Sequence, residues 1–309
     1  MKIAFMGTPE FGAIILEALA QRHEILAVVT KPDKKQGRGG KIVDSPVKFI
    51  AKKYNYRLLQ PSSARDPQFL TDLGSVDIIV TAAYGKILPR AVLERPRYGC
   101  LNVHGSLLPK YRGAAPVQWA LINGEAETGI TFMRMDTGVD TGDIIFKKAV
   151  AVNPTDDCGS LMNRLGITAA YCINDVLKKI VSGEAAYAKQ DDDQATYAPA
   201  ITGETACIDW SQPARRIANL ARAMSPEPGA TAGLFKIWKA EAIADLDGGT
   251  PHNIELPGEI ITVRKDGALV NTASGILLVT ELQAPGGKRM RATDYFRGHK
   301  PVTGMFQTM

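Results

Sequence analysis

The fold class follows from residues 2–30, which read KIAFMGTPEFGAIILEALAQRHEILAVVT. An apolar run, Ile3–Met6, stops at a Gly-Thr-Pro turn, and apolar side chains then recur at helical spacing up to Leu19. A second apolar run, Glu24–Thr30, has the length of a buried strand. This strand–helix–strand order predicts a parallel sheet covered by helices. The opening turn does not contain a G-x-G-x-x-G pattern, so it does not indicate a dinucleotide cofactor.

The alternation of strands and helices continues along the chain. Ser45 followed by Pro46 is typical of a helix start. Further helices are expected over residues 66–73, 87–93 and 161–180. Apolar runs predict strands over residues 57–60, 76–82, 100–104, 127–135 and 144–150. This rhythm predicts a doubly wound α/β sheet, in which ligands bind beyond the carboxyl ends of the strands.

Chain length and a change of composition predict two domains. At 309 residues the chain exceeds the size at which a single core usually stops growing. We expect a catalytic domain over 1–188, a linker over 189–205 with a solvated acidic run, and a smaller domain over 206–309. In this last part, a helix over 214–224 precedes short apolar runs between polar turns. Such runs predict a small antiparallel sheet or barrel, and an OB-like module is one option.

Bulk composition narrows the class of protein. No run of about 18 apolar residues predicts a transmembrane helix, and Pro9 and Glu10 interrupt the first apolar run before a signal peptide develops. The four cysteines lack metal-ligand spacing, which indicates reduced thiols in a cytoplasmic protein. The net charge of +5 is equally compatible with a polyanionic partner and with chance, so the location of the charge has to decide.

A polar pair near the end of one predicted strand marks the candidate site. Asn102 and His104 are two positions apart, so their side chains point to the same face of a strand. The turn over 136–143 carries three aspartates, and a carboxylate beside an imidazole orients it and favours its protonated form. An amide and an imidazole can together stabilise the oxyanion of a tetrahedral intermediate.

The sequence around this pair offers no nucleophile. Ser106 does not lie in a G-x-S-x-G pattern, and no second histidine supports a metal site. General acid–base catalysis with charge stabilisation remains, and it suits direct acyl transfer between two bound substrates. A purely structural histidine at a strand end is the alternative interpretation.

A basic, glycine-rich loop follows the second strand. Such a segment cannot bury a core, and it has two interpretations: a solvated surface loop, or a clamp that closes on phosphate groups. In the second case, Arg38 could engage two phosphate oxygens at once. The loop contains Lys31, Lys34, Lys35, Arg38 and Lys41.

Several motifs in this order resemble one known family, the methionyl-tRNA formyltransferases. The resemblance spans nearly the whole chain and ends near Gly298-His299. It is carried by Gly7-Thr8-Pro9-Glu10-Phe11, Lys31-Pro32-Asp33 with Gly37-Arg38-Gly39, Ala83-Tyr84-Gly85 with Ile87-Leu88-Pro89, Asn102 to Pro109, Tyr111 to Pro116, Met135 to Asp143, and Leu282-Gln283. It implies a Rossmann-like formyltransferase domain followed by a smaller β-barrel domain that binds tRNA.

The resemblance also implies a reaction and a catalytic set. The family moves the formyl group of 10-formyltetrahydrofolate to the amino group of methionine esterified to initiator tRNA. By motif, Asn102 and His104 would stabilise the oxyanion, and His104 would protonate the departing N10 of the folate. Asp140 would orient and charge the imidazole, which leaves Asp136 and Asp143 as turn or supporting groups.

The remaining assignments also come from the resemblance. The expected folate-binding residues are Ser106, Leu107, Leu108 and Pro109, and those expected to contact tRNA are Lys34, Lys35, Arg38 and Lys41. A monomer without a metal ion is expected. The chain departs from the family pattern at Thr202–Glu204 and Pro226–Ala232, which lie outside the catalytic set.

Two other functions stay open at this point. An enzyme that formylates a small amine, such as glycinamide ribonucleotide or an amino sugar, would carry the same catalytic signature. The second domain and the basic loop count against it. A non-catalytic RNA-binding protein on this scaffold would not depend on His104 for anything beyond RNA binding.

Overall fold

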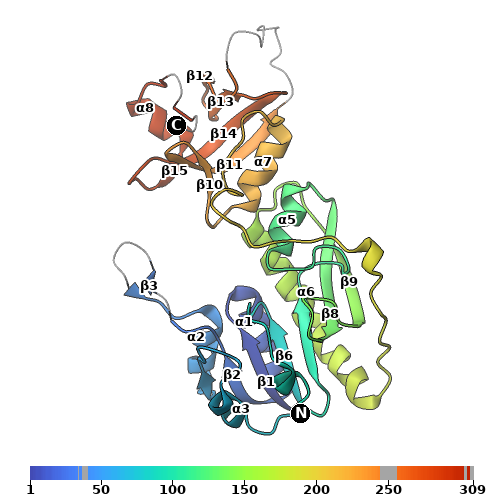
Figure 1. Ribbon diagram of the computed structural model, residues 1–309. Helices are drawn as coiled ribbons and strands as arrows, with labels where there is room; N and C mark the ends of the chain where they lie inside the picture. Colours follow the sequence, from blue (N-terminus) through green and yellow to red (C-terminus); the bar gives the residue numbers. More distant parts are fainter. Residues whose placement is uncertain (34, 37–40, 244–255, 303–304, 307–309) are drawn as a thin grey trace. The chain divides into compact units, whose positions relative to one another are not determined.

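The computed structural model describes residues 1–33, 35–36, 41–243, 256–302 and 305–306. The chain forms two compact units (Figure 1). The first comprises Met1–Pro116, Glu127–Ala151 and Met162–Pro199, and the second comprises Val117–Ala126, Val152–Leu161 and Ala200–Met309. Among the described residues, no helix has the length and apolar character needed to cross a membrane.

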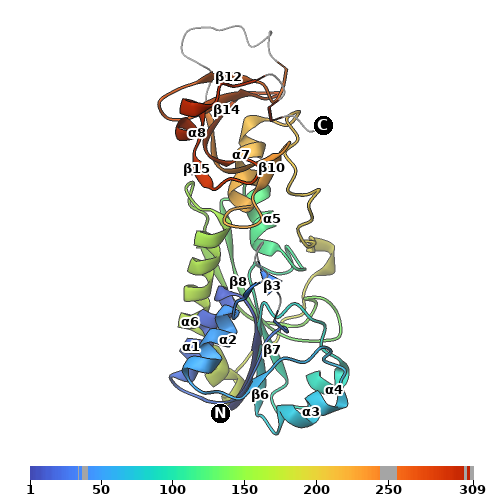
Figure 2. The same ribbon diagram turned by 90° about the vertical axis from the view of Figure 1, so that its left-hand side faces the viewer.

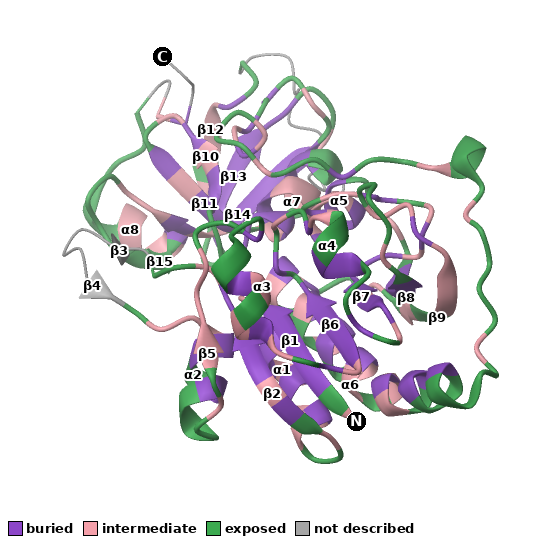
Figure 3. Ribbon diagram, turned by 60° about the horizontal axis from the view of Figure 1, so that its bottom comes forward, coloured by how far each residue is buried: buried purple, intermediate pink, exposed green. Residues whose placement is uncertain are grey.

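A seven-stranded sheet forms the centre of the first unit. Its strand order is β5-β2-β1-β6-β7-β8-β9, and the pairs among the first five are parallel. Strands β1 and β6 are buried along almost their whole length (Figure 3), as the apolar runs predict. The bounds are β1 Lys2–Gly7, β2 Glu24–Val29, β5 Leu58–Leu59, β6 Ile78–Ala82, β7 Cys100–His104, β8 Glu127–Arg134 and β9 Ile144–Ala151.

Helices cover both faces of this sheet. Figure 2 shows α1 and α6 on one face and α3 and α4 on the other. Phe69 and Val92 lie in one hydrophobic core with Met6 and Ile79 of the sheet. The bounds are α1 Glu10–Ala20, α2 Pro46–Lys53, α3 Pro67–Leu73, α4 Arg90–Leu93 and α6 Cys158–Ser182. Helix α5, Pro116–Ile122, belongs to the second unit except for its first residue. As predicted, Ser45 caps α2 and accepts a hydrogen bond from the Lys48 N–H.

The last two strands differ from the predicted parallel arrangement. Strand β8 runs antiparallel to β7, with Leu101 opposite Arg134 and His104 opposite Thr131, and β9 runs antiparallel to β8. The reason is the connection: after α5, which the sequence reading missed, the chain enters β8 at the end where β7 finishes. A short turn then joins β8 to β9, and such a turn can only connect antiparallel neighbours. This turn carries Asp140.

The second unit is built on an antiparallel sheet. Its strand order is β10-β11-β14-β13-β12, with β15 also paired to β14. The indole N–H of Trp210 donates to the carbonyl of Phe306 over 2.8 Å, and the two rings stack. The bounds are α7 Ala214–Ala223, β10 Ala230–Ala232, β11 Phe235–Ile243, β12 Ile260–Val263, β13 Ala268–Asn271, β14 Ile276–Gln283, β15 Arg289–Arg291 and α8 Ala292–Gly298.

Residues 189–199, here called the strap, belong to the first unit. The backbone of Arg112 pairs with this segment in both directions, donating to Thr196 over 2.8 Å and accepting from Ala198 over 2.7 Å. Ala115 N–H also donates to the Ala198 carbonyl. Thr196 and Ala198, which lie inside the segment predicted as a linker, are therefore hydrogen-bonded to the loop that follows β7.

Candidate active site

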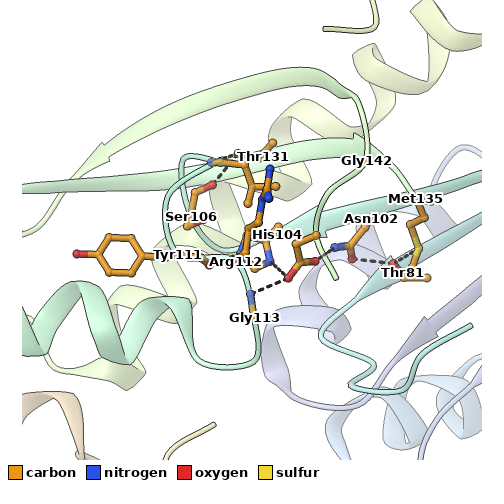
Figure 4. A network of polar contacts seen from close by, with 12 residues as sticks. Thr81, Asn102, His104, Ser106, Tyr111, Arg112, Gly113, Thr131, Met135 and Gly142 are labelled. Atoms are coloured by element: carbon orange, nitrogen blue, oxygen red, sulfur yellow. Dashed lines mark hydrogen bonds and ion pairs between the residues drawn. The ribbon is translucent and has the colours of Figure 1, made fainter. Parts of the chain in front are cut away.

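The structure brings Asn102, His104 and Asp140 together at the carboxyl end of β7 (Figure 4). Strand β7 supplies the amide and the imidazole, and the β8–β9 turn supplies the carboxylate. Asn102 Nδ2 donates to Asp140 Oδ1 over 3.3 Å, and His104 Nδ1 lies 3.6 Å from Asp140 Oδ2. The His104 and Asp140 side chains are only 7% and 15% exposed, so water screens their interaction weakly.

Thr81 on β6 fixes the orientation of the Asn102 amide. Its register places it beside Asn102, and its hydroxyl donates to Asn102 Oδ1 over 2.7 Å. An amide whose oxygen accepts from Thr81 must present its N–H groups on the other side. The Asn102 Nδ2 atom therefore faces Asp140 and the site.

One hydrogen bond shows which nitrogen of the His104 ring carries a hydrogen. Nε2 lies 2.9 Å from the carbonyl oxygen of Tyr111, and a carbonyl can only accept, so Nε2 carries a hydrogen. The nitrogen that faces Asp140 is Nδ1. It follows that Nδ1, rather than Nε2, is the ring nitrogen available for proton exchange in this arrangement.

A backbone N–H group holds the Asp140 carboxylate. Its Oδ2 atom accepts from the Gly113 N–H over 2.9 Å. Asp140 itself has φ 54°, a left-handed conformation that is uncommon outside glycine. Asp136 organises the same turn, because its Oδ1 accepts from Gly138 N–H and from the Thr141 hydroxyl. The predicted turn role of Asp136 is thus what the structure shows.

The folate-binding segment predicted at residues 106–109 is a tight loop after β7. Ser106 is fully buried, and its hydroxyl donates to the Lys110 carbonyl over 2.6 Å. Leu108 is also fully buried, and its N–H donates to Thr131 Oγ1. Leu107 and Pro109 are half-buried. A folate contact here stays a prediction, and it would involve backbone groups, Leu107 or Pro109 rather than the Ser106 hydroxyl.

The structure describes the backbone of two of the four residues predicted to contact tRNA. Lys35 and Lys41 fall in the short antiparallel strands β3 (Lys35–Gln36) and β4 (Lys41–Ile42). Lys34 and Arg38 lie outside the described residues. Their contact with tRNA stays a prediction.

A buried lysine links residues on either side of β3 and β4. The Lys48 ammonium on α2 contacts Asp33 before the hairpin and Asp44 after it. The hydrogen bond from Lys48 holds the pKa of Asp33 below its usual range, and the same bond raises the pKa of Lys48. Gln60 Nε2 adds a second hydrogen bond to Asp33. The ends of the basic loop are thereby held together.

Sequence reasoning missed four supporting residues. Thr81 is the one hydroxyl in an otherwise apolar buried strand, and that contrast is a usable signal. Arg112 and Gly113 belong to the motif from Tyr111 to Pro116, but the sequence alone did not predict a function for either residue. Gln190, which contacts the Asp140 turn, lies in a segment interpreted as a linker and offers no sequence signal. The described residues contain no cluster of three or more His, Cys, Asp or Glu side chains arranged to hold a metal ion.

Known proteins share both the sequence and the fold. Residues 1–177 match the formyl transferase family, and residues 200–300 match the formyl transferase C-terminal domain. The methionyl-tRNA formyltransferase of Caldanaerobacter subterraneus subsp. tengcongensis is 46% identical over 98% of this chain and 99% of its own. That of Geobacter metallireducens is 43% identical over 99% of this chain and 98% of its own.

Solved structures with little sequence identity show the same fold. The N-formyltransferase from Helicobacter canadensis, in complex with folinic acid and dTDP-3-aminofucose, has a TM-score of 0.66 at 18% identity and covers 94% of this chain and 100% of that one. HypX from Aquifex aeolicus in complex with tetrahydrofolic acid has a TM-score of 0.64 at 15% identity, over 96% of this chain and 47% of that one. Because its similarity to curated relatives extends over nearly its full length, the chain belongs to the methionyl-tRNA formyltransferase family.

Proposed function

We propose that this protein transfers the formyl group of 10-formyltetrahydrofolate to the amino group of methionyl-initiator tRNA, for translation initiation. The proposal rests on the convergence of Asn102, His104 and Asp140. It is supported by the similarity of the chain to a methionyl-tRNA formyltransferase over nearly the whole length of both. The tetrahydrofolate and folinic acid in the two related structures are consistent with a folate as the formyl donor.

The reaction is a direct acyl transfer. The methionyl amine forms a bond to the formyl carbon, the bond from that carbon to N10 breaks, the amine loses a proton, and N10 gains one. Since no proton is consumed overall, a single acid–base pair can take the proton from one nitrogen and return it to the other. The His104–Asp140 pair would do so through Nδ1.

The N–H groups around the pair provide charge stabilisation. The amide of Asn102 and Nδ1 of His104 both lie beside Asp140. A formyl oxygen bound next to them would gain one donor from the amide as it becomes negative, and a second once Nδ1 has taken the proton of the amine. The Asp140 carboxylate balances the charge of the protonated ring and favours the developing positive charge on the attacking amine. No serine or cysteine nucleophile is required.

The finer features of the protein are part of this proposal. The second unit would close as an OB-like β-barrel and, with the basic loop that carries Lys34, Lys35, Arg38 and Lys41, bind the acceptor tRNA. Residues 1–188 would act as the catalytic domain and 206–309 as the tRNA-binding domain. We expect a monomer that acts in the cytoplasm.

The decisive experiment compares acceptors with a single formyl donor. Purified protein and 10-formyltetrahydrofolate should formylate methionyl-initiator tRNA, and His104→Ala should abolish nearly all transfer. Free amino-sugar nucleotides and glycinamide ribonucleotide serve as competing acceptors. Preferential use of a small amine would favour a sugar-type enzyme, and parental activity of His104→Ala would refute the mechanism.

A further inference from the structure

We propose that Gln190 is a positioning residue of the formyl-transfer site, which fixes the Asp140 turn against the loop that holds His104. This inference rests on the function proposed above. Gln190 lies in the strap, between the two matched family regions 1–177 and 200–300, so neither region covers it.

The Gln190 side chain uses both ends of its amide. Its Nε2 atom donates to the carbonyl oxygens of Asp140 and Gly142, each over 2.8 Å. Its Oε1 atom accepts from Arg112 Nε over 3.0 Å. One half-buried side chain thus bridges two loops that are separate in sequence, the β8–β9 turn and the loop after β7.

The first of these contacts bears on Asp140 directly. Its backbone is held in a left-handed conformation at φ 54°, which costs free energy in a non-glycine residue and persists only where the surroundings fix it. The hydrogen bonds to its carbonyl and to that of Gly142 are surroundings of this kind. Asp136 also holds this turn, so loss of both Gln190 donors would loosen the turn without freeing it, and the Asp140 carboxylate would shift.

The second contact bears on His104 through the loop after β7. Arg112 is only 4% exposed, and besides Gln190 it contacts Asp192 in the strap over 2.7 Å. The residue on each side of it touches the catalytic groups by its backbone: the Tyr111 carbonyl accepts from His104 Nε2, and the Gly113 N–H donates to Asp140 Oδ2. A shift of Arg112 would therefore displace the backbone groups that contact His104 and Asp140.

Gly113 shows how closely the strap approaches this loop. It has φ 125°, and a Cβ atom at this position would lie 2.6 Å from the Ala198 carbonyl oxygen. Tyr111 N–H also donates to the Thr196 hydroxyl over 2.9 Å. The strap therefore contacts the catalytic loop at three successive residues, and Gln190 is the member of the strap that continues to the Asp140 turn.

The test uses Gln190→Ala and Gln190→Glu. The alanine removes all three hydrogen bonds. The glutamate keeps the shape and the contact with Arg112, but it cannot donate to the two carbonyls and sets a carboxylate oxygen against them. Its effect is therefore expected at the Asp140 turn rather than at Arg112. Gln194→Ala is the matched control, because that glutamine lies in the same strap and bonds to Asp191 over 2.7 Å.

The expected result is a split between kinetic constants. Both Gln190 variants should lower kcat by about ten- to a hundredfold, because displacement of catalytic groups by about 1 Å has effects of this size. KM for the folate donor and for the tRNA should stay within about twofold. In ¹⁵N-histidine spectra the His104 ring signals, assigned with His104→Gln, should shift in both variants and not in Gln194→Ala.

Three outcomes would overturn the proposal. The first is a kcat equal to that of Gln194→Ala, and the second is an equal change in kcat and in KM for tRNA, which would place the role of the strap in binding. The third is an unchanged His104 spectrum. If the parent protein did not formylate methionyl-tRNA at all, the proposed function would fail, and the spectrum alone would decide the role of Gln190. If Gln190→Ala did not fold, Gln190→Glu would carry the test.

Discussion

Replacement of Thr81 by valine tests whether the orientation of the Asn102 amide matters for catalysis. Thr81 is 3% exposed, and valine is β-branched like threonine, so the substitution removes the hydroxyl without opening a cavity. The hydrogen bond of 2.7 Å to Asn102 Oδ1 is lost. The amide then has only its 3.3 Å contact with Asp140 to fix which side carries the N–H groups.

The magnitude follows from the lost hydrogen bond. A partly buried acceptor left without its donor costs about 1–3 kcal/mol. Flipping of the amide would place Oδ1 against the Asp140 carboxylate, and this repulsion opposes the flip and limits the loss. We therefore expect about 1–2 kcal/mol in the transition state, which corresponds to a kcat lowered about five- to thirtyfold. Thr81→Ser keeps the hydroxyl and should stay within about threefold of the parent.

The assay is steady-state formylation of methionyl-tRNA, with thermal unfolding as a check that each variant is folded. Thr81→Val should have no further effect on kcat in an Asn102→Ala background, because its influence passes through that amide. A parental kcat for Thr81→Val would refute the reasoning. So would an equal effect in the presence and absence of Asn102.

Three further predictions concern other parts of the first and second units. Lys48→Met removes the link between Asp33 and Asp44, so it should raise KM for tRNA about fivefold and leave KM for the folate unchanged. Lys53→Met, on the same helix, should change neither KM. An equal rise in the two KM values of Lys48→Met would contradict the role assigned to Lys48. Burial raises the pKa of Cys100 and Cys158 to about 12, so at pH 8 neither thiol should react with a thiol reagent until the protein unfolds. Rapid labelling of the folded protein, mapped to either residue by mass spectrometry, would disprove this. Burial also lowers the pKa of His23, so below about pH 6.5 the unfolded chain binds a proton more readily than the folded chain, and stability falls. The loss of unfolding free energy between pH 7 and pH 5.5, measured by denaturation, should be smaller for His23→Gln than for the parent. An equal loss in the two proteins would contradict this prediction.

Local patterns were sufficient for most of the elements. The strand over Cys100–His104 has the predicted bounds, and α1, α3, α6 and α7 lie where apolar periodicity places them. These predictions succeed because burial on one face imposes a period of 2 or 3.6 on the sequence itself. Helix α5 has buried residues at helical spacing, Val117, Ala120 and Leu121, but it is only seven residues long. Its omission concealed the antiparallel return of β8.

The sequence by itself determined that Asn102 and His104 share one face at the end of a strand, and that a turn rich in aspartate follows later in the chain. Residue reasoning left three aspartates open, and only the resemblance to a family selected Asp140. The tertiary structure decided which carboxylate reaches the imidazole, that Nε2 is occupied by Tyr111, and that Thr81 and Gln190 support the site. The physical reason is that these contacts depend on strand order, register and the path of the strap, which join residues too far apart in the chain for any local periodicity to relate them.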